Sequence, residues 1–94
     1  MPDALIRPMT TGDAPAAERL SSAAYYEVDL RTFQRGWPDP SPRTPARAER
    51  WHRRTEHLLR TDPGGCWVAE ADGEVVGFAI SLTRELMWIL ASYA

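Results

Sequence analysis

The chain has 94 residues, 44% of them hydrophobic and 26% charged, and its formal net charge is −2. This size and composition predict one small globular domain, residues 1–94, with a modest hydrophobic core. Eleven arginines stand against 13 acidic residues and no lysine is present, which excludes lysine Schiff-base chemistry and gives no basic footprint for nucleic acid.

Cysteine usage and hydropathy predict the compartment. The single cysteine, Cys66, can form neither an internal disulfide nor a multi-cysteine zinc site. The N-terminus has no apolar signal core, and the longest apolar run is far shorter than the roughly 20 residues that cross a bilayer. We therefore expect a cytoplasmic protein with neither a membrane partner nor a bound metal.

The first elements in chain order are a short strand over residues 4–9 and a helix over residues 10–28. Asp13 is a favourable N-cap residue, and Pro15 sits in the first turn, where its missing N–H costs little. Helical spacing predicts one buried face, made of Ala16, Ala17, Leu20, Ala23, Ala24 and Val28.

Residues 29–45 are predicted to be irregular, because they contain four of the eight prolines and a glycine. This loop nevertheless carries Phe33 and Trp37, two large apolar residues that a plain linker would not need. A second helix is predicted over residues 44–65, with Thr44 as its N-cap.

Residues 66–85 show two alternating runs on either side of Asp72-Gly73, a strong hairpin signal. The second run predicts a core face made of Val76, Phe78, Ile80 and Leu82. The run 86–91 is entirely apolar, which is typical of a strand buried on both faces. The element order β-α-α-β-β-β predicts an α+β fold with a mainly antiparallel sheet.

Three segments together resemble the GCN5-related N-acetyltransferases, or GNAT superfamily. They are IRPMTTGDAPAAERL, VAEADGEVVGFAISL and LMWILASYA, in that order. The resemblance implies a GNAT-like half-fold, the N-terminal portion of an acetyl-CoA-dependent N-acetyltransferase. The pyrophosphate-binding motif of the family, Gln/Arg-x-x-Gly-x-Gly/Ala, includes none of the six glycines. We therefore expect this isolated chain to bind acetyl-CoA weakly or not at all and to be inactive alone, with the rest of the fold covering its last strand.

The resemblance also implies the residues of the site. The main chain of Ser92, Tyr93 and Ala94 would contact the acetyl group and pantetheine arm of acetyl-CoA; the alternative is a frayed chain end. The acceptor is expected to be a small-molecule or peptide amine. Glu85 is the first candidate for the general base and Glu70 the second, although each is more readily interpreted as a surface carboxylate.

The loop between the two helices would border the pocket for the amine acceptor. Its candidate residues are Tyr25, Tyr26, Phe33 and Trp37, whose rings suit an ammonium group through cation–π contact. The alternative for Phe33 and Trp37 is that they fasten the loop to the core. A third hypothesis makes these aromatic residues the pocket of a regulatory ligand-binding domain.

An alternative function follows from the apolar last strand. The chain would then be a non-catalytic, GNAT-like dimerisation or interaction module, forming a homodimer through this C-terminal strand. Exposed strand edges and apolar patches favour such pairing.

Overall fold

A computed structural model describes residues 4–94, so residues 1–3 of the predicted domain lie outside it. The predicted α+β fold and its β-α-α-β-β-β order are confirmed. The four strands form one antiparallel sheet in the order β1-β2-β3-β4. The elements are β1 Leu5–Pro8, α1 Ala14–Thr32, α2 Pro45–Thr61, β2 Cys66–Ala71, β3 Glu74–Arg84 and β4 Met87–Tyr93, with the short 3-10 turns η1 Thr11–Asp13 and η2 Pro63–Gly65. No helix in residues 4–94 is long and apolar enough to cross a membrane.

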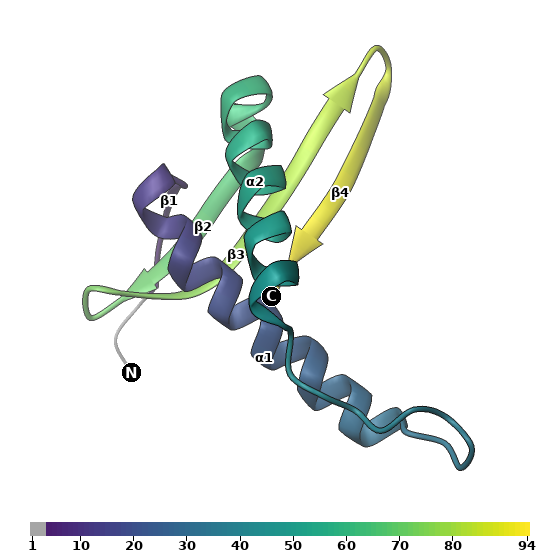
Figure 1. Ribbon diagram of the computed structural model, residues 1–94. Helices are drawn as coiled ribbons and strands as arrows, with labels where there is room; N and C mark the ends of the chain where they lie inside the picture. The colour runs from purple at the N-terminus through teal and green to yellow at the C-terminus, as the bar shows by residue number, and fades with distance from the viewer. Residues whose placement is uncertain (1–3) are drawn as a thin grey trace.

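Both helices lie on the same face of the sheet (Figure 1). The core between them and the sheet consists of Met9, Ala17, Trp51, Leu58, Cys66, Val68, Phe78 and Ile80. Trp51 of α2 meets Phe78 of β3 edge to face, with ring centroids 5.7 Å apart. The opposite face of the sheet, which we call the open face, carries no helix from the described part of the chain.

The first helix begins and ends four residues later than predicted, and it buries a partly different set of residues. It ends at Thr32, and its buried residues are Ala14, Ala17 and Ser21. Val28, predicted to be buried, is exposed because the second half of α1 extends beyond the sheet. The irregular segment is correspondingly shorter, residues 33–44, and we call it the Pro-rich loop.

Local signals fix the start of the second helix and the hairpin as predicted, whereas α2 ends at Thr61, four residues earlier than predicted. The Thr44 side chain accepts a hydrogen bond from Arg47 N (3.3 Å) at the start of α2. Asp72 and Gly73 both have positive φ, 52° and 79°, in the two-residue turn between β2 and β3. Val76 is exposed, so its predicted place on the core face of β3 is wrong. A register shift places Glu70 opposite Val75 and leaves Val76 as the extra residue of a β-bulge.

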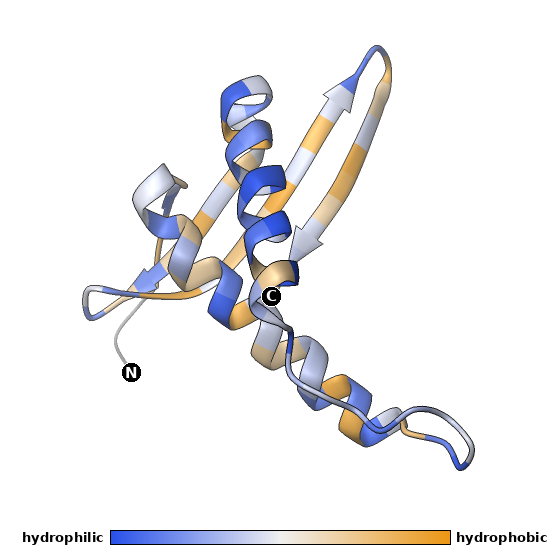
Figure 2. Cartoon of the chain, in the orientation of Figure 1, coloured by the Kyte–Doolittle hydropathy of each residue, from blue (hydrophilic) through white to orange (hydrophobic). Residues whose placement is uncertain are grey.

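The last strand is not buried in this chain, contrary to its sequence pattern. β4 is an edge strand, and the β3–β4 hairpin extends away from the helices (Figure 1). Apolar residues are concentrated along β4 (Figure 2). The exposed large apolar side chains from the turn to the end of the strand are Leu86, Met87, Trp88, Ile89, Leu90 and Tyr93. A second register shift leaves Ala91 unpaired as a bulge in β4.

Candidate functional site

Two adjoining pockets lie between the second half of α1 and the Pro-rich loop. One has a volume of about 260 Å³ and contains Phe33 and Trp37. The other has a volume of about 220 Å³ and contains Tyr25 and Tyr26. Both pockets are lined by Asp29, Ser41 and Arg47. The structure therefore brings the four predicted aromatic residues to one place, which we call the aromatic groove.

The aromatic residues of the groove are not core residues. Phe33 and Trp37 are exposed and lie outside the hydrophobic core, so the structure gives no support to the alternative that they fasten the loop there. Exposed aromatic faces beside a carboxylate suit a cationic ligand, and the groove places Asp29 between the two aromatic pairs. Arg47 adds a positive group that could pair with an acid on the same ligand.

Arg43, which the sequence did not single out, fastens the Pro-rich loop to both helices. Its guanidinium group donates to Ser21 Oγ (2.9 Å) and Glu18 Oε1 (3.3 Å) of α1. The same group lies over the ring of Trp51 in α2, 5.8 Å from the centroid. The Arg43 and Glu18 side chains are only 15% and 13% exposed, so solvent screens this ion pair weakly. Arg43 therefore holds one wall of the groove in place.

The predicted cofactor-binding residues lie at the end of β4. Ala94 N donates to Phe78 O (3.1 Å) and Phe78 N donates to Ala94 O (2.9 Å), so the main chain of Ala94 is occupied by β3. Successive residues of a strand turn their backbone groups to opposite edges. Ser92, paired with Ile80, therefore also faces β3, whereas the N–H and C=O of Tyr93 face the open edge of the sheet.

Neither carboxylate proposed as a base lies beside Tyr93. Glu85 occupies the β3–β4 turn with φ 55°, two residues before the start of β4. Tyr93 lies eight residues further along the extended chain, which corresponds to about 26 Å from Glu85. Glu70 accepts from Arg7 Nε (3.3 Å) at the other side of the sheet, two strands away from β4. The structure therefore brings neither of them to the predicted cofactor site.

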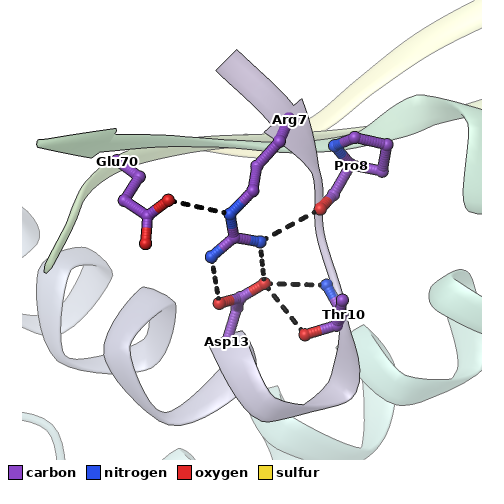
Figure 3. Close-up of polar contacts among 5 residues, drawn as sticks. All are labelled: Arg7, Pro8, Thr10, Asp13 and Glu70. Carbon is purple, nitrogen blue, oxygen red and sulfur yellow. Dashed lines mark hydrogen bonds and ion pairs between the residues drawn. The ribbon is translucent and has the colours of Figure 1, made fainter. Parts of the chain in front are cut away.

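An ion-pair network joins β1, β2 and the start of α1 (Figure 3). Arg7 forms a bidentate pair with Asp13, with Nη1–Oδ2 at 2.7 Å and Nη2–Oδ1 at 2.9 Å. Asp13 also accepts from Thr10 N (2.8 Å) and Thr10 Oγ1 (3.0 Å). Asp13 is at the N-cap position as predicted, but its carboxylate makes no cap bond to α1 and binds Arg7 and Thr10 instead.

This network fastens β1 to the start of α1 and lowers the pKa of one of its carboxyl groups. The hydrogen bonds from Arg7 hold the pKa of the Asp13 carboxyl well below its usual range. Arg7 and Asp13 are six residues apart and on different elements, so no short motif in the sequence could reveal the pair.

Cys66 is fully buried and burial raises the pKa of its thiol, which fits a core residue rather than a nucleophile.

Comparison with known proteins places the chain in a family. No curated protein and no solved structure matches the sequence. Residues 22–93 match the family described as the Acetyltransferase (GNAT) family. This match includes the aromatic groove, the β2–β3 hairpin and β4. The chain therefore belongs to the GNAT acetyltransferase family.

Proposed function

We propose that this chain is the N-terminal part of an acetyl-CoA-dependent N-acetyltransferase, which transfers an acetyl group to a small-molecule or peptide amine. The observation that carries the proposal is the family match over residues 22–93, because it spans both the aromatic groove and the open end of β4. In this assignment the groove holds the acceptor and the end of β4 contributes to the cofactor site.

The end of β4 fits an extended, amide-bearing molecule such as the pantetheine arm of acetyl-CoA. Tyr93 offers one N–H donor and one C=O acceptor at an edge that no other strand of the described chain pairs with. When bound, acetyl-CoA supplies the thioester carbonyl that an amine attacks. Because only Tyr93 offers free main-chain groups among the three predicted residues, this end of β4 alone should hold the cofactor weakly.

The aromatic groove binds the acceptor in this proposal. The rings of Tyr25, Tyr26, Phe33 and Trp37 offer cation–π contacts to an ammonium group, and Asp29 contributes the opposite charge. Transfer requires the neutral amine, so the ammonium group must lose its proton before attack. We assign no residue of this chain to that step, since Glu85 and Glu70 both lie far from Tyr93.

The groove can be tested by following the four tryptophan indole N–H signals by NMR during titration with a primary amine. We expect the Trp37 signal to shift most, because Trp37 lines the groove and the other three tryptophans do not. The N-acetylated form of the same amine should bind several-fold more weakly, because acetylation removes the positive charge. Equal shifts for both compounds would contradict the assignment.

Two variants separate the groove from general charge effects. Asp29→Asn should weaken amine binding about three- to tenfold, in line with about 1 kcal/mol for a partly exposed charged contact. Glu56→Gln removes one negative charge from the exposed face of α2 and should leave binding unchanged. Calorimetry with acetyl-CoA tests the other end of the site, and micromolar affinity for this chain would contradict the weak binding that we expect.

A second candidate is a non-catalytic interaction module. The exposed apolar side chains of β4 favour it, because soluble monomers rarely leave a whole strand of such residues uncovered. The two candidates differ in whether the biological unit is an enzyme, although a partner on β4 and a small molecule in the groove would occupy different surfaces.

A further inference from the structure

The aromatic groove contains charges of both signs that the described part of the chain leaves unpaired. Asp29 and Arg47 line both of its pockets, and Asp39 lines one of them. None of these three groups forms an ion pair within residues 4–94, and Asp29 and Arg47 do not pair with each other. Opposite charges that line one groove without pairing are both available to a ligand.

The two shared charges lie at helix ends where they do not help the helix. Asp29 is in the last turn of α1, and Arg47 is in the first turn of α2. The helix dipole disfavours an acidic residue at a C-terminus and a basic residue at an N-terminus. Neither residue has an oppositely charged neighbour three or four positions away on its own helix. Helix stability therefore explains neither charge, whereas a ligand with complementary charges would use both.

The two pockets of the groove differ in their polar groups. The first, which we call the Trp37 pocket, contains the carboxylates of Asp29 and Asp39 beside two aromatic rings. The second, which we call the Tyr26 pocket, has Asp29 as its only carboxylate and contains the hydroxyl groups of two tyrosines and two serines. Aromatic rings and carboxylates suit an ammonium group. Hydroxyl groups and the guanidinium group of Arg47 suit an acid, because all of them can donate hydrogen bonds to it.

Arg47 is the cation that the groove leaves to such an acid. Arg43 also lines the Tyr26 pocket, but its guanidinium group is already paired with Glu18 Oε1 (3.3 Å) and lies over a tryptophan ring of α2. Arg43 thereby holds the Pro-rich loop, which runs back along the second half of α1 to the start of α2 (Figure 1). Its charge is compensated by Glu18, so Arg47 supplies the free positive charge among the described residues that line the two pockets.

The size of the pockets favours one ligand that occupies both. Their volumes, about 260 and 220 Å³, are each below the roughly 300–1,000 Å³ of ordinary small-molecule sites. Together they fall within this range. Because Asp29, Ser41 and Arg47 line both pockets, a single small molecule can place one end in each.

We propose that the acceptor is a zwitterionic small molecule of the amino acid class, with its amine in the Trp37 pocket and its carboxylate on Arg47 in the Tyr26 pocket. In this assignment Asp29 and Asp39 hold the ammonium group. Arg47 determines the specificity, because it distinguishes an amine that carries an acid from one that does not. This inference rests on the proposed function, since it takes the aromatic groove as the acceptor site.

Titration of the chain with a panel of free amino acids and the matching amino acid amides tests the acceptor class. The indole N–H signal of Trp37 reports binding, and an amide keeps the ammonium group but lacks the negative charge. We expect the best-binding amino acid to bind roughly five- to tenfold more tightly than its amide, between the values for exposed ion pairs and for charged hydrogen bonds. Amides that bind as tightly throughout the panel would overturn this inference and leave the amine site in place. A Trp37 signal that responds to no amine at all would overturn the acceptor site as well.

Arg47→Gln tests the residue that selects the acid. This variant should bind the amino acid no better than its amide, and its affinity for the amide should be unchanged. Arg50→Gln is the matched control, because Arg50 is also exposed on α2 and lines neither pocket. The thermal midpoint of Arg47→Gln should be equal or slightly higher, since a cation is removed from the first turn of a helix, so weaker binding would not reflect unfolding. A preference for the acid that survives Arg47→Gln would overturn the assignment.

Asp39→Asn tests the orientation of the ligand. Asp39 lines only the Trp37 pocket, where the amine is placed. Its loss should weaken binding of the amino acid and of its amide by the same factor, because both compounds carry the ammonium group. An Asp39→Asn variant that weakens binding of the amino acid alone would overturn the proposed orientation.

Discussion

Gly65 supplies the sharpest stability prediction because it lies against the backbone of β3. A Cβ atom added at Gly65 would be 2.6 Å from Ser81 Oγ and 3.0 Å from the Ser81 carbonyl carbon, and closer still to the Ser81 carbonyl oxygen. Real Cβ atoms essentially never approach other atoms closer than 3.0 Å. The neighbour includes backbone, so a side-chain rotation alone cannot make room for alanine.

The cost of Gly65→Ala can be estimated from two effects. Forcing a methyl group into a packed region costs about 1–3 kcal/mol. The shift also strains the hydrogen bond that Ser81 Oγ donates to Gly65 O (3.0 Å), worth about 1 kcal/mol. We therefore expect Gly65→Ala to lower the free energy of unfolding by about 2–4 kcal/mol. A chain of this size has roughly 5–14 kcal/mol in total.

Gly64 offers the matched control on the adjacent residue. A Cβ atom at Gly64 meets nothing within 4 Å, and its φ is not in the left-handed region. Gly64→Ala should therefore leave stability unchanged or raise it by up to about 1 kcal/mol, since alanine restricts the unfolded chain. Urea unfolding monitored by tryptophan fluorescence should show a midpoint lower by roughly 1–3 M for Gly65→Ala only. Midpoints within about 0.3 M of each other would refute the reasoning.

Three further predictions concern polar groups that the fold places in unusual surroundings. Thr55→Val should raise the free energy of unfolding by about 1 kcal/mol in urea titrations, because Thr55 Oγ1 is buried and has no hydrogen-bond partner within residues 4–94; a loss of stability would contradict this. The pKa of Asp13 is depressed in the folded chain. Below about pH 5 the unfolded chain therefore binds more protons than the folded chain, and the free energy of unfolding decreases as the pH is lowered. Asp13→Asn lacks this titration, and its thermal midpoint should fall less steeply between pH 5 and pH 2; parallel slopes would count against the ion pair. Arg43→Gln should speed chymotrypsin cleavage in the Pro-rich loop by roughly 10- to 150-fold, since a partly buried charged hydrogen bond is worth about 1.5–3 kcal/mol, whereas exposed Arg50→Gln should have no effect.

Much of the fold could be predicted because its signals are local. Asp72-Gly73 specifies a two-residue turn through the positive φ angles that both residues adopt. Thr44 and the proline after it begin α2 where the sequence indicates. The element order then follows, and with it the α+β class. Phe33 and Trp37 could be singled out from the sequence, because large rings in a Pro-rich loop have no local structural reason. Tyr25 and Tyr26 of α1 were named only because the family resemblance implies an acceptor pocket beside that loop.

Other features depend on contacts between distant parts of the chain. The bulge at Val76 reverses the side-chain alternation at one end of β3, and only the register with β2 reveals it. Asp13 leaves its expected cap bond because Arg7 of β1 offers a stronger, charged partner. Arg43 appears in the sequence as one arginine among eleven, and its role arises from packing over Trp51.

The sequence by itself determined that β4 is apolar on both faces, which is a property of its side chains. The tertiary structure decided that this strand lies at the sheet edge, with the backbone groups of Trp88, Leu90 and Tyr93 facing outward. The side chains of a strand set how much free energy its burial would release. Only strand order and register decide which faces and backbone groups of the strand are left exposed.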